Sequence, residues 1–171
     1  MDCKSRRDDI LQPVHSNNMA NTYTQMYLHF VFAVQNRISL IQPEWKDELY
    51  KYITGIVQNN KHKLIAINGM PNHLHVFVGY KPHQLIPGLL QDIKGSSSQW
   101  INSKDLVKGK FSWQEGYGAF SYSHSHIDSV VKYIMSQEEH HKKRTFREEY
   151  VELLDRFHID YSEKYLLIDV E

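Results

Sequence analysis

Two adjacent strand-like segments, joined by a tight turn, constrain the fold of this chain more than any other feature. They run from Lys63 to Met70 and from His73 to Tyr80, and both are rich in apolar and β-branched residues. The connection Gly69-Met-Pro-Asn72 contains residues that favour turns. The pattern predicts an antiparallel β-hairpin, and therefore a sheet against which the rest of the chain must pack.

The segments around this hairpin alternate between strand and helix patterns. The expected elements are a strand over 23–34, a helix over 43–59 that begins at a proline, the two hairpin strands, a helix over 89–102 and a strand over 117–122. The order β-α-β-β-α-β is that of the split βαβ, ferredoxin-like arrangement. We therefore predict an α+β fold, with an antiparallel sheet that carries helices on one face. The long first strand could offer a free edge for pairing with a second copy.

Two further helices are expected after the last strand, and they carry most of the remaining candidate site residues. Ser125, with Asp128 three residues later, predicts the start of a helix that reaches about Lys143. The segment Thr145-Phe-Arg-Glu148 has the pattern of a capping box and predicts a final helix to about Phe157. An extended arm is expected from Asp160 onward.

Size and composition indicate one ordinary globular domain. Of the 171 residues, 41% are hydrophobic and 23% are charged, and the formal net charge is zero, which disfavours a protein that coats nucleic acid non-specifically. The single cysteine, Cys3, cannot form an internal disulfide. We expect residues 1–18 to be a flexible leader and 19–171 to be the domain. No apolar run is long enough to span a membrane, and the leader lacks a secretory signal, so a cytoplasmic location is expected.

His73 and His75 are the strongest candidates for chemistry. Residues two apart on a strand project to the same face, so both imidazoles can approach one metal ion or one phosphate. Tyr133 and Gln137 lie four apart on an expected helix and share a face, so they could complete such a site. The alternative is that the two histidines are half-buried strand residues without a partner.

Phosphoryl transfer from DNA to a tyrosine uses these residue types together. A phenolate that attacks a phosphodiester conserves the bond energy in a phosphotyrosine link, so a later hydroxyl can reseal the strand. A divalent ion held by two imidazoles and an amide carbonyl would orient the phosphate and neutralise developing charge. Such mixed nitrogen and oxygen ligands are compatible with Mg²⁺ or Mn²⁺.

Three segments of the chain resemble the IS-two-hundred-like transposases, the single-tyrosine enzymes with a His-hydrophobic-His motif. The segments are Gly69-Met-Pro-Asn-His-Leu-His-Val-Phe-Val78, Phe111-Ser-Trp-Gln-Glu-Gly-Tyr-Gly-Ala-Phe-Ser121 and Tyr133-Ile-Met-Ser-Gln-Glu-Glu-His-His141. The resemblance implies that His73 and His75 are metal ligands, that Gln137 is the third ligand and that Tyr133 is the nucleophile. It also implies single-stranded DNA with hairpin ends as substrate and a homodimer, in which the tyrosine can act within its own chain or across the dimer.

Basic residues near the expected tyrosine helix are candidates for phosphate contact. They are Lys142, Lys143 and Arg144 after that helix and Lys94 on the preceding one, although a solvated helix end would look the same. Three other functions stay open from the sequence. They are a ferredoxin-like nucleic-acid-binding protein without a covalent step, a metal-dependent hydrolase in which Tyr133 is structural, and a relative that processes chromosomal repeat (REP) hairpins with the same chemistry.

Overall fold

The computed structural model describes residues 23–162 and 166. Their elements, in chain order, are β1 (Met26–Ala33), α1 (Pro43–Asn59), β2 (Lys63–Met70), β3 (His73–Tyr80), α2 (Ile86–Ser103), β4 (Gly118–Tyr122), α3 (Ile127–Met135), α4 (Gln137–His141) and α5 (Phe146–Arg156). Short 3-10 turns lie at Gln35–Arg37 and His124–His126. Within this part of the chain, no helix is long and apolar enough to cross a membrane. The predicted leader and most of the predicted extended arm lie outside the described residues.

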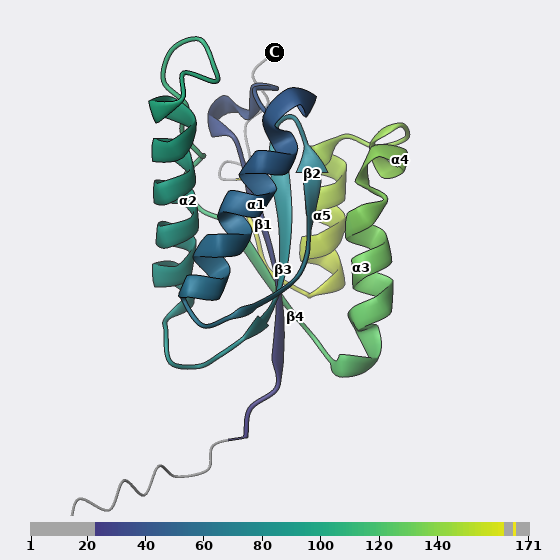
Figure 1. Ribbon diagram of the computed structural model, residues 1–171. Coiled ribbons are helices and arrows are strands. Elements are labelled where there is room, and N and C mark those ends of the chain that lie inside the picture. Colours follow the sequence, from purple (N-terminus) through teal and green to yellow (C-terminus); the bar gives the residue numbers. More distant parts are fainter. Residues whose placement is uncertain (1–22, 163–165, 167–171) are drawn as a thin grey trace, which may run out of the picture.

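The four strands form one antiparallel sheet in the order β2-β3-β1-β4 (Figure 1). With α1 between β1 and β2 and α2 between β3 and β4, this is the split βαβ arrangement. The predicted fold class is confirmed. The expectation that the first strand offers a free edge was wrong, because β1 is hydrogen-bonded on both sides and the outer strands are β2 and β4.

The predicted hairpin is confirmed with both strand boundaries unchanged. β2 and β3 pair so that Met70 lies opposite His73 and Asn68 lies opposite His75. Gly69 is needed at the closed end, because a Cβ there would collide with the backbone oxygen of His73. The hairpin turn therefore fixes the position at which the two histidines leave the sheet.

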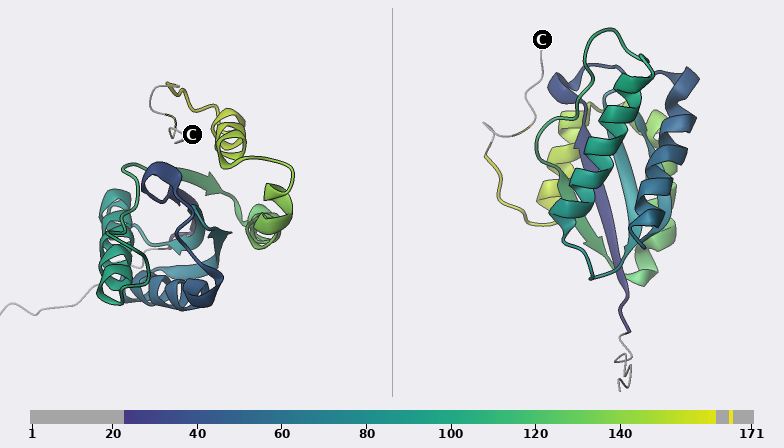
Figure 2. Two further views of the ribbon diagram at one scale, coloured as in Figure 1. Left: turned by 90° about the horizontal axis from the view of Figure 1, so that it is seen from above. Right: turned by 60° about the vertical axis from the view of Figure 1, so that its left-hand side comes forward.

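One face of the sheet is covered by α1 and α2 (Figures 1 and 2). The main hydrophobic core lies between these two helices and the sheet. The even-numbered residues of β1 and β3 point into this core. The helices contribute side chains at helical spacing, which are Trp45, Leu49, Ile53 and Val57 from α1 and Leu89, Leu90, Ile93 and Ile101 from α2. Pro87 lies in the first turn of α2, which therefore begins before the predicted Leu89.

The opposite face of the sheet is covered by the C-terminal helices (Figure 2). Val31, Ala33 and Phe120 pack against α5, and Phe77 packs against α3. The helices are thus not confined to one face, since those that follow β4 close the second. The odd-numbered residues of β1 and β3, including His73 and His75, lie beneath them.

The helix predicted from Ser125 to Lys143 is broken. Ser125 lies in a 3-10 turn and α3 begins at Ile127, with no side chain capping its start. At Ser136 the hydroxyl donates to the carbonyl oxygen of Lys132 at 2.8 Å, an interaction that bends helices, and α4 begins one residue later. The predicted capping box at Thr145 and Glu148 is present and opens α5.

Candidate metal centre

His73 and His75 lie side by side on β3, and both side chains are completely buried. The ring of His73 stacks on Phe146 of α5, with 4.0 Å between ring centroids. The ring of His75 meets Tyr133 of α3 edge to face at 5.9 Å. The His pair therefore occupies the seam where α3 and α5 both reach the sheet.

His73 and His75 use their Nδ1 atoms in hydrogen bonds, so both Nε2 atoms remain available to bind a ligand. His73 Nδ1 lies 2.7 Å from the side-chain oxygen of Asn72, which only accepts, so His73 carries its ring proton on Nδ1. His75 Nδ1 lies 2.9 Å from Nε2 of His29 on β1, which is also buried. Both Nε2 atoms are buried without a hydrogen-bond partner among the described residues. Burial, followed by the nearby His75 ring, lowers the pKa of His73, so its neutral form and free lone pair are favoured.

A carboxylate that the sequence analysis did not single out faces the two histidines. Glu149 projects from α5, is 6% exposed, and places Oε2 at 3.6 Å from Nε2 of both His73 and His75. His141 Nε2 lies 3.0 Å from the same oxygen. Burial alone would raise the pKa of Glu149, but the hydrogen bond from His141 and the adjacent His75 and His73 rings outweigh it and hold the pKa well below its usual range. The ionised form of the Glu149 carboxyl is therefore favoured.

The group formed by His73, His75 and Glu149 fits a metal ion. One ligand atom from each lies within 4.8 Å of the other two, and all three residues are buried. The 3.6 Å from Glu149 Oε2 to Nε2 of each histidine is too long for a hydrogen bond. It is close to the separation of roughly 3–3.5 Å between two ligand atoms that bind one ion at ~2.0–2.2 Å. Two unpartnered imidazole nitrogens and an ionised carboxylate are the donor set of a metal site of the His-His-acid type.

Gln137, the predicted third ligand, is also buried at this site. Its side-chain Nε2 donates to Glu149 Oε1 at 2.9 Å, and its Oε1 has no hydrogen-bond partner among the described residues. Gln137 thus holds the carboxylate in place and keeps a free acceptor nearby. Its role as a ligand stays a prediction.

Tyr133 reaches the same carboxylate from α3. Its hydroxyl donates to Glu149 Oε1, and its ring is half-buried. Burial, followed by the negative charge of Glu149, raises the pKa of Tyr133 above its usual value. Tyr133 and Gln137 do not lie on one continuous helix as predicted, but both converge on the same oxygen atom. The tyrosine is thus next to the His pair of its own chain.

The four basic residues predicted to contact DNA are placed differently from one another. Lys143 and Arg144 line a cavity of about 590 Å³ next to Tyr133, whereas Lys142 is exposed and paired with Glu139 at 2.6 Å. Lys94 lies on α2, across the sheet from the tyrosine, and its Nζ donates to the carbonyl oxygens of Gln114 and Gly116. This geometry gives Lys94 a structural role and does not support the predicted contact.

A model of the family described as "Transposase IS200 like" matches residues 22–137, more than half of the chain. The chain belongs to this family. The family assignment made from the three motifs is thereby confirmed. The match ends at Gln137, so α5 and Glu149 lie outside the matched region.

Individual transposases are similar to this member of the family. The ISDra2 transposase TnpA of Deinococcus radiodurans is 24% identical over 133 residues, which cover 75% of this chain and 95% of that protein. The fold is similar to that of a protein assigned as a transposase from D. radiodurans R1, with a TM-score of 0.55, 24% identity, and coverage of 68% of this chain and 94% of the other. It is also similar to a REP-associated tyrosine transposase bound to a REP hairpin, with a TM-score of 0.52, 16% identity, and coverage of 67% and 68%.

Glu149 and His29 are the residues of this site that sequence reasoning missed. Glu149 follows the apolar spacing of α5, with Phe146 three residues before it and Leu153 four residues after, so a carboxylate occupies a core-facing position. A charged residue on the apolar stripe of a helix was the available signal. His29 gave a similar signal, as a histidine inside an apolar strand on the same face as Val31.

Proposed function

We propose that this transposase cleaves and rejoins single-stranded DNA through a 5′-phosphotyrosine at Tyr133, assisted by a divalent ion held by His73, His75 and Glu149. One observation carries the proposal. The Tyr133 hydroxyl and the Nε2 atoms of both histidines converge on a single buried carboxylate. A candidate nucleophile and a candidate metal site thus lie next to each other, and phosphoryl transfer to a tyrosine requires such proximity.

Cleavage is a single displacement at phosphorus. The Tyr133 oxygen forms a bond to the phosphorus, and the bond between phosphorus and the 3′ oxygen breaks. The phenolic proton is released and the 3′ oxygen takes up a proton. Attack by a 3′ hydroxyl of another strand reverses these changes, so the strand is resealed and the tyrosine is restored.

The residues around Tyr133 have distinct parts in this reaction. Glu149 Oε1 accepts a hydrogen bond from the Tyr133 hydroxyl and so aligns it, and the side chain of Gln137 keeps Glu149 in place. A bound divalent ion would neutralise charge on the scissile phosphate and offset the Glu149 charge that disfavours the phenolate. Two imidazoles with one carboxylate favour Mn²⁺ over Mg²⁺.

The DNA substrate and the assembly are part of the proposal. The REP-associated relative is bound to a DNA hairpin, and we propose hairpin-bearing single-stranded ends as the substrate here. We also propose a homodimer, because excision of an element requires two ends to be cut. The outer strands β2 and β4 are the edges available for pairing. Light scattering at micromolar concentration, with and without DNA, tests this, and a strictly monomeric protein would contradict it.

A covalent adduct tests the reaction itself. The full chain is incubated with single-stranded oligonucleotides from the ends of its own element and with Mn²⁺ or Mg²⁺, then resolved on a denaturing gel. We expect a tyrosine-dependent protein–DNA band that Tyr133→Phe abolishes while DNA binding persists. Cleaved ends without an adduct would favour the hydrolase, and binding without cleavage would favour the non-catalytic nucleic-acid-binding protein.

A further inference from the structure

Two cavities meet at Tyr133. The first, of about 590 Å³, lies between α3 with α4 on one side and α5 on the other. The second, of about 420 Å³, lies between the end of β4, the start of α3 and the end of α5. Tyr133 and Arg156 line both cavities, so the candidate nucleophile is at their junction.

Charges in the first cavity favour an anion. Three acidic residues line it, but Glu149 is directed at the His pair and Glu139 is paired with Lys142 outside the lining. Only Glu152 then opposes the cations, and it is shared by Arg144 and Arg156. The cations of the lining are Lys132, Lys143, Arg144 and Arg156, and the two lysines have no ion pair among the described residues.

The second cavity has a different lining. Its aromatic wall consists of Tyr122 and Phe157, whose rings meet edge to face at 5.2 Å. Arg156 lines this cavity together with Tyr122 and Phe157, and its positive charge opposes the rise that burial causes in the pKa of Tyr122. Around the wall are hydrogen-bonding side chains, namely Ser121, Ser123, His126 and Ser129. Aromatic faces next to hydroxyl and imidazole groups suit an unstacked nucleobase.

We propose that the two cavities form one binding track for a single strand of DNA that crosses Tyr133. Phosphates of the strand lie along the first cavity, the scissile phosphate lies at the junction, and an unpaired base enters the second cavity beside Tyr122 and Phe157. A paired base cannot enter without leaving its duplex, so the track selects single strands. This proposal rests on the proposed function for its substrate class and adds the residues that hold it.

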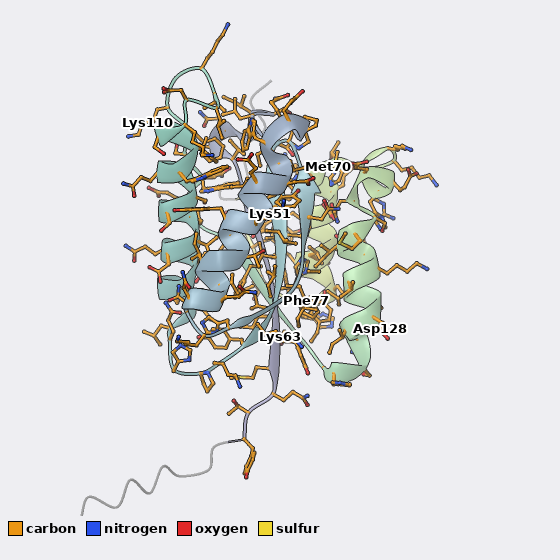
Figure 3. All side chains as sticks on the ribbon, in the orientation of Figure 1. Lys51, Lys63, Met70, Phe77, Lys110 and Asp128 are labelled. Carbon is orange, nitrogen blue, oxygen red and sulfur yellow. The ribbon has the colours of Figure 1, made fainter. Side chains whose placement is uncertain are left out.

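Equilibrium binding without metal tests the track separately from catalysis. Fluorescence anisotropy of a labelled twelve-nucleotide oligothymidylate is measured with the full chain in EDTA over a range of salt concentrations. The double variant Lys132→Gln/Lys143→Gln should reduce the slope of log affinity against log salt by about 1.4, since each lost phosphate contact removes ~0.7 for a single strand. The matched control is Lys51→Gln on α1, across the sheet (Figure 3), which should leave the slope unchanged.

A second variant tests the base pocket. Phe157→Leu keeps apolar volume but removes the ring, and it should weaken oligothymidylate binding at least about fivefold. Binding of an abasic oligonucleotide of equal length, which retains the phosphates, should not change. Equal losses on both probes, tight binding of duplex DNA, or a slope unaffected by the lysine variants would overturn the track. Because no cleavage occurs in EDTA, a missing covalent adduct would refute the proposed reaction and leave this result intact.

Discussion

The two faces of the sheet are built from the same strands but serve opposite purposes. Toward α1 and α2, residues such as Phe30 and Leu74 form an apolar core. Toward α3, α4 and α5, their strand neighbours His29, His73 and His75 are buried with atoms that lack hydrogen-bond partners among the described residues. Burying unpaired polar atoms costs free energy. The first face therefore carries the main apolar core, and the second combines smaller apolar clusters with a preassembled site.

Leu74 and His75 test this division most directly, because they are adjacent residues on opposite faces, both fully buried. His75→Ala should abolish metal-dependent adduct formation and reduce stability less, because it removes a buried, unpartnered Nε2 atom and this offsets the hydrogen bond that His29 loses. Leu74→Ala should lower the free energy of unfolding by about 2–5 kcal/mol. Adduct gels and urea denaturation followed by circular dichroism measure both effects. Normal cleavage by the His75 variant would make the His pair structural.

Removing the Glu149 charge should produce the next largest effect. Glu149→Gln preserves shape but replaces an anionic ligand, so we expect Mn²⁺ affinity by calorimetry to fall about 100-fold or more. Asp155→Asn on the exposed side of the same helix is the matched control and should bind Mn²⁺ normally. Unchanged affinity in the Glu149 variant would leave Gln137 as the third ligand.

His29 should affect the metal through His75. If His75 Nδ1 donates to His29 Nε2, then His75 Nε2 keeps its lone pair toward the ion. His29→Phe should then weaken Mn²⁺ binding by about 10–100-fold. His29→Gln, whose oxygen can accept the same hydrogen bond, should recover much of the affinity. Equal losses in both variants would indicate that only the packing of His29 matters.

Substitution of Lys94 should have the smallest effect on DNA binding. Its Nζ donates hydrogen bonds to two carbonyl oxygens near the start of β4, so Lys94→Gln should destabilise the fold by about 1–2 kcal/mol. The salt dependence of oligonucleotide binding should not change, in contrast to the variants at Lys132 and Lys143. A flatter salt dependence would restore the phosphate contact predicted from the sequence.

Local patterns predicted most of the fold. The hairpin strands and the capping box of α5 were predicted correctly because turn and cap preferences act over a few residues. The position of β1 between β3 and β4 depends on long-range pairing, which its own residues do not reveal. The break at Ser136 depends on a side-chain hydrogen bond that competes with the helix.

The candidate site was predictable where it follows a short motif and not where it depends on packing. His73, His75, Tyr133 and Gln137 were identified from spacing and resemblance, and the structure brings all four together. Glu149 joins them only because α5 folds back over the sheet beside the His pair. Its carboxylate resembles any surface glutamate until the burial of that helix is known.

The dependence of the site on α5 links the chemistry to the integrity of the chain. This helix supplies Glu149 to the site, the ring of Phe146 to His73, and the hydrogen-bond acceptor to Tyr133. A chain interrupted at the connection near Lys143, by a premature stop or a protease, would lose all three together. The apolar core under α1 and α2 would still be present. During synthesis, the proposed DNA cleavage would thus have to wait until α5 has left the ribosome.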